Sequence, residues 1–177
     1  MDPLWAPWRL AYIQAEAVTA PEPKSHVLLP GADAECFVCR AVVDDADREN
    51  LVVDRTELSI VILNRFPYNN GHLLIAPRRH QGELAQLTPE EQLDLMQVIA
   101  RQNERLQRLM RPDGFNVGLN LGRVAGAGLP GHLHWHIVPR WSGDTNFMPV
   151  LAGAKVIPQS LDALWELLTQ DEPRRKQ

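Results

Sequence analysis

Three of the six histidines in this chain alternate with apolar residues in one short stretch, at His132, His134 and His136. In an extended strand, successive side chains point to opposite faces. The spacing therefore predicts that the three imidazoles share one face and that the apolar residues between them pack in a core. The backbones of His132 and His136 would stand roughly 13 Å apart, so the three rings could not easily share one metal ion. An exposed strand with solvated histidines is the alternative interpretation.

A row of imidazoles suits nucleophilic and acid–base chemistry, because histidine changes its charge close to neutral pH. An imidazole nitrogen can also attack phosphorus directly. The attacking nitrogen must then be unprotonated, with the proton held on the other ring nitrogen by an acceptor. His134 has a histidine two positions away on each side that could supply such contacts, so it is the predicted centre of the site.

The sequence around these histidines resembles the histidine triad (HIT) family of nucleotide hydrolases and transferases. The signature of that family, His-φ-His-φ-His-φ-φ with φ apolar, is matched in full from His132 to Val138. The resemblance extends from about Cys36 to Trp141. It includes, in the order expected of the family, Leu63-Asn64-Arg65, Gly71-His72-Leu73-Leu74-Ile75, Pro77 to His80, Asn120 and a glycine-rich loop.

The resemblance implies a role for each matched residue. His134 would be the nucleophile that forms a covalent nucleotidyl-histidine with the α-phosphate, and His132 and His136 would contact the phosphate and position it. His72 matches the fourth active-site histidine of the family, and Asn64 matches a residue near the nucleotide ribose. Without the resemblance, a half-buried structural histidine would explain His72 equally well.

The loop at residues 122–131 contains four glycines in ten positions. Glycine lets backbone N–H groups approach an anion closely. No Gly-Lys-Ser/Thr follows, so the loop is not a P-loop, and alone it would be read as a flexible connector. Its position directly before His132 favours phosphate binding, and the resemblance implies that nucleotide contacts come from Asn120 and from Gly126, Ala127 and Gly128. Many family members carry a serine or glutamine late in this loop; residues 127–129 offer none, which leaves protonation of the leaving group to His72 or water.

Cys36 and Cys39 form a Cys-x-x-Cys motif, and two cysteines in a chain expected in the cytoplasm favour metal binding over a disulfide. A redox motif is less favoured, because no strand is evident just upstream. Zinc-bearing members of the HIT family add a histidine after Pro-x-x and the first triad histidine. The resemblance therefore implies a closed, structural Zn²⁺ site made of Cys36, Cys39, His80 and His132.

Composition is typical of a soluble enzyme. The chain has 177 residues, of which 45% are hydrophobic and 23% are charged, enough for one domain with a full core. The net charge of −4 argues against nucleic acid as the main partner. No segment resembles a signal peptide or approaches the length of a transmembrane helix. We expect a cytoplasmic protein without membrane contact.

The periodicity of the chain predicts an α+β fold, in which an antiparallel sheet carries one long helix and a short C-terminal helix. Thr88, Pro89 and Glu91 form a helix start that leads to a helix ending near Met110, and residues 160–168 predict the short helix. A tight hairpin turn is expected at residues 69–71. The predicted strands are residues 51–53, 57–63, 72–76, 115–121 and the histidine stretch 132–138.

The domain prediction divides the chain into an N-terminal arm and loop, residues 1–34, and a single HIT-type domain, residues 35–177. The arm carries Trp5, Trp8 and Tyr12, which need a surface to bury against. That surface could lie on the same domain or on a second subunit. Many HIT proteins are twofold dimers, so the resemblance also implies a homodimer.

The N-terminal arm and the segment that follows Pro139 are similar to the longer bacterial HIT proteins, a group that includes diadenosine tetraphosphate phosphorylases. That similarity implies cleavage of a dinucleoside polyphosphate at the α-phosphate, with inorganic phosphate as acceptor. A hydrolase or phosphoramidase that uses water shares the first step, so the histidines do not separate these reactions. A nucleotide-binding module without turnover is the non-enzymatic alternative.

Overall fold

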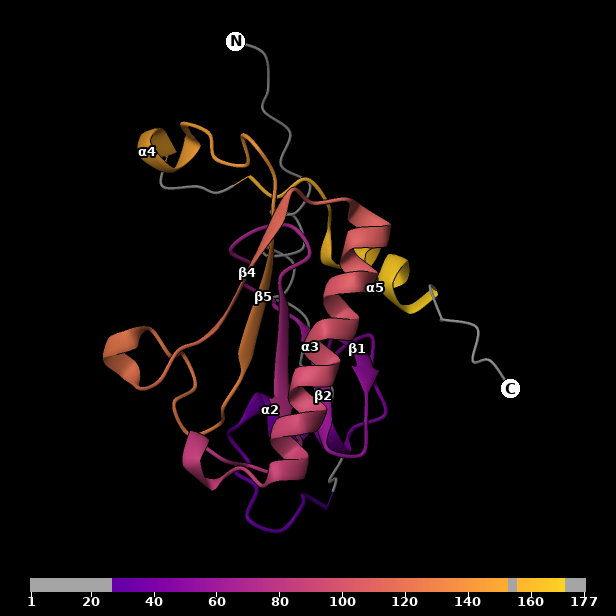
Figure 1. Ribbon diagram of the computed structural model, residues 1–177, viewed down its shortest axis with the longest axis vertical. Helices are drawn as coiled ribbons and strands as arrows, with labels where there is room; N and C mark the ends of the chain where they lie inside the picture. The colour runs from indigo at the N-terminus through magenta and orange to yellow at the C-terminus, as the bar shows by residue number, and fades with distance from the viewer. Residues whose placement is uncertain (1–26, 153–155, 171–177) are drawn as a thin grey trace, which may run out of the picture.

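The centre of the fold is a five-stranded antiparallel sheet with the strand order β1-β2-β3-β5-β4 (Figure 1). The computed structural model describes residues 27–152 and 156–170 of the chain. Because β5 inserts between β3 and β4, the last strand in the sequence lies inside the sheet and β4 lies at its edge. The strands are β1 Val52–Arg55, β2 Ser59–Leu63, β3 Leu73–Pro77, β4 Gly114–Leu119 and β5 Trp135–Arg140.

Helix α3, Pro89–Met110, packs across the sheet and contacts β2, β3 and β5 (Figure 1). It starts with the predicted capping box: the Thr88 hydroxyl accepts from the Glu91 N–H, and the Glu91 carboxylate accepts from the Thr88 N–H. It ends where Arg111 adopts a left-handed conformation, with φ of 48°. The helical period predicts an apolar face of Leu95, Val98, Ile99, Leu106 and Met110; the first four are buried, and Met110 is partly buried against the core.

Three further α-helices complete the described part of the fold. Helix α2, Phe37–Val43, follows Cys36 and contributes four buried side chains to the core. Helix α5, Leu161–Gln170, is the predicted C-terminal helix, and it packs beside β1, where the Trp165 indole N–H donates to the Val52 carbonyl at 2.8 Å. The short helix α4, Met148–Ala152, has no buried residue. The predicted α+β class is confirmed, whereas α2 was not expected.

The histidine stretch differs from its prediction, because regular pairing starts only at Trp135. The N–H of Leu133 donates to the carbonyl of Gln81 at 2.7 Å, and the N–H of His132 donates to the carbonyl of Leu129 at 3.3 Å. These hydrogen bonds are made to loop residues and not to a neighbouring strand. The prediction that the strand starts at residue 132 is therefore wrong. The apolar residues of the stretch do pack in the core, as expected: Leu133, Trp135 and Ile137 are all buried.

The connection between β2 and β3 is also longer than the predicted tight hairpin, since it spans residues 64–72. The Asn64 N–H donates to the His72 carbonyl at 2.9 Å and closes this loop at its base. Within it, residues 69–72 make a turn in which Gly71 has φ of +73°, a conformation that glycine adopts without strain. The loop thus wraps around the side chain of His72.

Three remaining predictions concern the termini and the membrane. The aromatic residues Trp5, Trp8 and Tyr12 lie outside the described residues, and the division of the chain at residue 35 stays a prediction. Between residues 27 and 170, with the gap at 153–155 left aside, the helices are too short or too polar to cross a bilayer.

Candidate active site and metal centre

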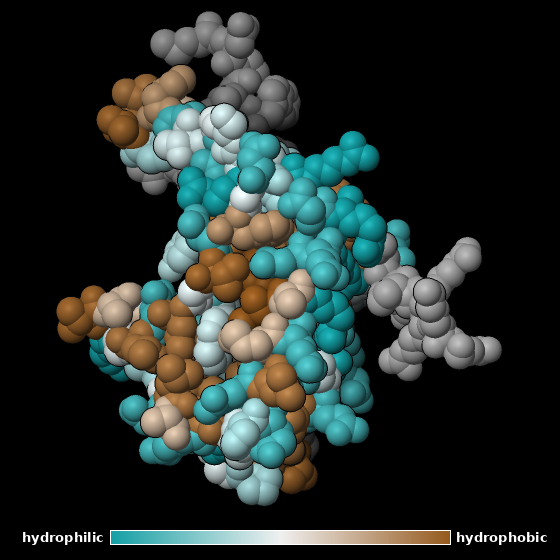
Figure 2. All heavy atoms as spheres, in the orientation of Figure 1, coloured by the Kyte–Doolittle hydropathy of each residue, from teal (hydrophilic) through white to brown (hydrophobic). Residues whose placement is uncertain are grey.

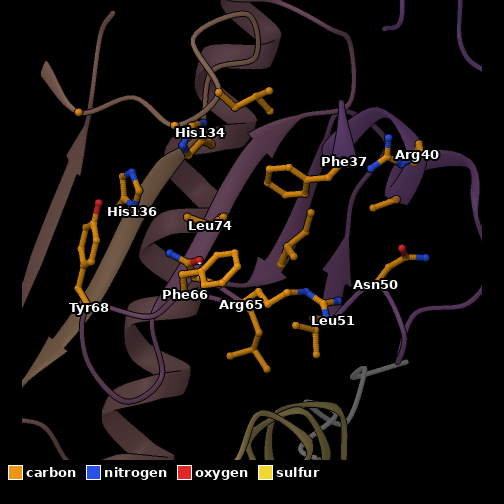
Figure 3. A pocket seen from close by; sticks show the side chains of 17 residues that line it. Phe37, Arg40, Asn50, Leu51, Arg65, Phe66, Tyr68, Leu74, His134 and His136 are labelled. Atoms are coloured by element: carbon orange, nitrogen blue, oxygen red, sulfur yellow. Dashed lines mark hydrogen bonds between the residues drawn. The ribbon is translucent and has the colours of Figure 1, made fainter. Parts of the chain in front are cut away.

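A cavity of about 740 Å³ lies beside the start of β5. Its catalytic end is lined by His134 and His136 and by the loop glycines Gly126 and Gly128. Figure 3 shows both histidines on one side of the cavity and Phe37, Arg40 and Asn50 across from them. The cavity therefore joins a cluster of titratable side chains to a largely apolar chamber, a combination typical of a ligand site.

His134 is held in a defined tautomer. Its Nδ1 lies 2.9 Å from the backbone carbonyl of His132, which can only accept a hydrogen bond. Nδ1 therefore carries the proton and donates it, and Nε2 keeps a free lone pair. The side chain is buried and lines the cavity. This is the arrangement that nucleophilic attack by Nε2 requires.

His136 receives its hydrogen bond from His72, whose Nε2 lies 2.9 Å from Nδ1 of His136. The Nδ1 atom of His72 accepts from the Tyr68 N–H at 3.0 Å and faces the Asn64 amide nitrogen at 3.2 Å. Because Nδ1 of His72 accepts, the proton of the neutral ring is on Nε2, which donates to His136. His136 in turn carries its own proton on Nε2.

Burial lowers the pKa of His136 from 6.5 to about 4, and electrostatic repulsion from the neighbouring His134 ring, if both were protonated, acts in the same direction. His136 is therefore neutral at physiological pH. The rings of His134 and His136 lie 5.1 Å apart in an edge-on arrangement. The site thus places an unprotonated nitrogen of His134 next to a ring N–H donor of His136.

The Asn64 side chain is fixed at both ends. Its Oδ1 accepts from the Phe66 N–H at 2.9 Å, and its Nδ2 is directed to Nδ1 of His72. Asn64 lines the cavity, as the predicted ribose contact requires. His72 is fully buried and does not line the cavity, so it reaches a ligand only through His136.

The glycine-rich loop contributes fewer free amides than its sequence suggests. The Gly126 N–H donates to the Arg123 carbonyl, and the Ala127 N–H donates to the Gly122 carbonyl. Within the described residues, the Gly128 N–H has no such acceptor, so it is the amide available to a phosphate. Ala127 is buried and does not line the cavity.

Asn120 lies at the edge of the site. Its Nδ2 is 3.5 Å from Nε2 of His136, which is beyond the usual range of a hydrogen bond. Nε2 of His136 therefore remains available to a ligand. Asn120 does not itself line the cavity.

The four predicted metal ligands come together in a second cluster. The candidate ligand atoms of Cys36, Cys39, His80 and His132 all lie within 4.8 Å of one another, close enough to hold a metal ion. Nε2 of His132 lies 2.8 Å from the Pro77 carbonyl and so carries the proton, which leaves the lone pair on Nδ1. That Nδ1 faces the Sγ atoms of Cys36 and Cys39 at 3.3 and 3.5 Å.

The surroundings of the two thiols fit a metal ion. Nδ1 of His80 lies 3.2 Å from Sγ of Cys39, and the N–H of Cys39 points to Sγ of Cys36 at 3.5 Å. Burial raises the pKa of the Cys36 thiol from 9.0 to about 11. A thiolate in this place therefore needs a bound cation to offset its desolvation. Two thiols and two imidazoles are a donor set that Zn²⁺ prefers.

The structure separates the three histidines of the triad. His134 and His136 face the cavity, whereas the His132 ring is fully buried among the thiols and 5.0 Å from the ring of His80. The His132 side chain therefore lies in the metal cluster, and its backbone carbonyl is the part that touches His134. The predicted phosphate contact by His132 is not apparent in this arrangement.

The apolar chamber and Tyr68 were not predicted from the sequence. Phe37, Leu51 and Ile62 form walls of the cavity, and Tyr68 lines it beside His136. The exposed aromatic residues of Phe66-Pro67-Tyr68 are a signal that could have been used, because large aromatic side chains in a loop commonly mark a binding surface. Phe37 lies between the two cysteines, where only the metal motif was considered.

Comparison with known proteins agrees with this geometry. A family model described as HIT domain matches residues 46–143. The chain is 42% identical over 172 residues to a Mycobacterium tuberculosis protein named AP-4-A phosphorylase, covering 97% of this chain and 85% of that protein. It is 34% identical over 90 residues to an asymmetrical bis(5′-nucleosyl)-tetraphosphatase of Schizosaccharomyces pombe, covering 51% of this chain and 49% of that protein. A Zn-bound histidine triad family protein from Mycobacterium smegmatis has a TM-score of 0.62 and 27% identity, covering 77% of this chain and 91% of that chain.

Proposed function

The chain belongs to the HIT domain family, and from this premise we propose that it cleaves dinucleoside polyphosphates such as diadenosine tetraphosphate at the α-phosphate. The adenylyl group would pass through a covalent intermediate on His134 to inorganic phosphate. The observation that carries the proposal is the tautomer of His134, whose Nδ1 is committed to the His132 carbonyl while Nε2 stays free beside the cavity. The similarity to the mycobacterial AP-4-A phosphorylase supports the choice of substrate.

The cavity suits one nucleotide half of such a substrate. Phe37, Leu51 and Ile62 offer apolar walls for a planar base. Asn64 also lines the cavity, and its amide lies 3.2 Å from Nδ1 of His72, so it would contact the ribose near the histidines. The Gly128 amide and the Nε2–H of His136 are donors for the phosphate oxygens. The α-phosphate would then lie against Nε2 of His134.

In the first step, Nε2 of His134 attacks the α-phosphorus, and the bond from that phosphorus to the bridging oxygen breaks. ATP leaves, and the adenylyl group stays on His134. The His132 carbonyl holds the Nδ1 proton and so stabilises the cationic ring that develops during attack. His136 and the loop amide stabilise the charge on the phosphate oxygens.

In the second step, inorganic phosphate attacks the adenylyl group, ADP leaves, and His134 returns to its starting form. The overall reaction converts diadenosine tetraphosphate and inorganic phosphate into ATP and ADP, so its atoms balance. Water in place of phosphate would give AMP instead. A hydrolase or phosphoramidase is therefore the alternative, and it shares the first step.

We propose Zn²⁺ as the metal held by Cys36, Cys39, His80 and His132, with a structural role. All four ligands would come from the chain, so the ion would have no open position for substrate. Its place would tie the Cys36 region to the segment just before β5. The Zn-bound mycobacterial relative supports this choice.

We propose a homodimer formed around the free edge of the sheet. Among the strands of the described residues, β4 pairs only with β5, and Val117 in its middle is 44% exposed. Figure 2 shows apolar side chains gathered on the face of the molecule that it presents. Leu93 and Met96 on α3 and Leu121, which follows β4, are exposed apolar residues. An unpaired strand edge and an apolar surface together favour association. Light scattering that gives the mass of one chain would overturn the dimer.

We expect this enzyme in the cytoplasm, where reduced thiols keep the metal site intact.

The decisive experiment incubates the protein with diadenosine tetraphosphate, with and without inorganic phosphate, and separates the nucleotides. ATP and ADP that form only with phosphate would support a phosphorylase. ATP and AMP formed regardless of phosphate would assign a hydrolase, and no turnover of the dinucleotide would overturn the proposed substrate.

A further inference from the structure

The glycine-rich loop lacks the side-chain donor that a departing phosphate oxygen needs. Residues 126–129 read Gly-Ala-Gly-Leu, without a hydroxyl or an amide side chain. Negative charge develops on the leaving oxygen as its bond to phosphorus breaks, and a nearby hydrogen-bond donor stabilises that charge. The Gly128 N–H and the His136 Nε2–H donate to the other phosphate oxygens, so a donor to the leaving oxygen must come from elsewhere in the site.

Tyr68 is held against His136 by its ring. The two rings are stacked, with an angle of 18° between their planes and 5.6 Å between their centroids. The same ring packs on His72 at 4.7 Å, and the Tyr68 N–H donates to His72 Nδ1 at 3.0 Å. Backbone and side chain therefore both fix Tyr68 to the histidine pair, and its position is less variable than that of an ordinary exposed tyrosine.

The hydroxyl of Tyr68 is accessible to a ligand in the cavity. Figure 3 shows it beside His136, at the same end of the cavity, with the ring standing upright from the loop. Tyr68 lines the cavity and is 50% exposed. Among the described residues, none forms a hydrogen bond with this hydroxyl.

We propose that the Tyr68 hydroxyl donates a hydrogen bond to the leaving oxygen and supplies the donor that residues 126–129 lack. The assignment rests on the proposed function, because it requires attack by His134 on the α-phosphorus. During that attack the phosphorus–oxygen bond breaks and its electron pair stays on the leaving oxygen. That oxygen then accepts a hydrogen bond from the Tyr68 O–H, while the Gly128 N–H and the His136 Nε2–H donate to the other phosphate oxygens.

The alternative role for Tyr68 is structural: its ring would only pack against His136. This role and the donor role predict different effects of substitution. Packing requires the aromatic ring and not the oxygen, so phenylalanine would replace tyrosine without loss. A donor to the leaving oxygen matters most when the leaving group is a poor one. The two roles are therefore separated by removing one atom and by changing the leaving group.

The test compares the full-length protein with its Tyr68→Phe variant on two esters of AMP, phenyl and 4-nitrophenyl. Phenolate is a poor leaving group, since its conjugate acid has a pKa of about 10, as for tyrosine. The nitro group makes the second ester far less dependent on a donor. We expect kcat/KM for the phenyl ester to fall about tenfold in the variant, equivalent to about 1.4 kcal/mol of lost transition-state stabilisation. For the 4-nitrophenyl ester it should change by less than about twofold.

Each outcome has one meaning. Equal rates of wild type and variant on both esters, or equal losses on both, would overturn the role of the hydroxyl. A thermal melt of the variant confirms that the fold is intact, and Tyr68→Leu should lower turnover of both esters because it also removes the ring from His136. If the wild type cleaves diadenosine tetraphosphate but neither ester, the role of the hydroxyl is overturned alone; if it does not cleave the dinucleotide, the proposed function fails, and the assignment of Tyr68 fails with it.

Discussion

The backbone carbonyl of His132 accepts a hydrogen bond from Nδ1 of His134 at 2.9 Å, while the ring of the same His132 faces the thiols of Cys36 and Cys39. One residue therefore belongs to both clusters, through its side chain in one case and its backbone in the other. A change at the metal cluster that moved the His132 backbone would therefore also move the carbonyl that holds the Nδ1 proton of His134. The two sites meet at this one residue.

Replacement of His134 by alanine should abolish the covalent step. The variant lacks the attacking nitrogen, and no other histidine in the cavity has an imidazole nitrogen that is both free and directed by a carbonyl. We expect turnover to fall by more than about a thousandfold. The measurement is turnover of diadenosine tetraphosphate, together with trapping of the radiolabelled adenylyl group on denatured protein. Nucleotide binding measured by calorimetry should change little, and a labelled variant would contradict the assignment of the nucleophile.

Removal of the metal should destabilise the protein and slow the enzyme together. A loss of about 3 kcal/mol in the free energy of unfolding corresponds to a fall in melting temperature of roughly 6–12 °C for a chain of this size. Cys39→Ser should have the same effect, because Cys39 faces both His80 and His132. Metal content by mass spectrometry accompanies each melt. A sample proven free of metal that melts at the same temperature would rule out the structural role.

Local sequence signals predicted the long helix and the burial of Leu133, Trp135 and Ile137 between the histidines. The start of α3 is encoded by Thr88, Pro89 and Glu91 within four positions, and its buried face follows from the helical period. The fold class followed from the same periodicity. The ligand set of the metal cluster required the family resemblance, since His80 and His132 are far from the cysteines in sequence.

Features that depend on tertiary contacts were missed. The residues of α2 include three valines, which favour strand, and its seven residues are too few to show a helical period. The late start of β5 depends on a bond from Leu133 to the distant Gln81 carbonyl. The place of Tyr68 depends on how the loop 64–72 closes around His72. None of these contacts is visible in a local pattern.

Stability should decline in mild acid because of His136. Its pKa is lowered from 6.5 to about 4 by burial, so between these values the unfolded chain binds a proton that the native ring does not. The free energy of unfolding is then fully retained above pH 6.5 and falls towards pH 4, by at most about 1.4 kcal/mol per pH unit from this group. Urea unfolding of wild type and His136→Asn at several pH values measures it. A wild-type slope equal to that of the variant would contradict the prediction.

Replacement of Gly71 by alanine should destabilise the turn that leads into His72. A Cβ atom there would lie 2.8 Å from Sδ of Met110 and 3.3 Å from Cγ of Pro139, and the backbone has φ of +73°. Backbone strain and contact with the Pro139 ring add, while the flexible end of Met110 can move aside, so we expect a loss of about 2 kcal/mol in the free energy of unfolding. Because His72 follows directly, the hydrogen bond to His136 should weaken and turnover should fall as well.

Substitutions at two other glycines serve as controls, because they separate the effect of backbone strain from the effect of crowding. Gly31 has φ of +76°, and a Cβ atom added there would meet no atom within 4 Å, so Gly31→Ala adds strain alone and should cost about 1 kcal/mol. Gly114 has neither a positive φ nor a close neighbour, and Gly114→Ala should change stability by less than about 0.5 kcal/mol. Denaturant unfolding of the three variants gives the comparison. A Gly71→Ala variant no less stable than Gly31→Ala would show that Met110 and Pro139 give way, and that only the backbone conformation matters at this turn.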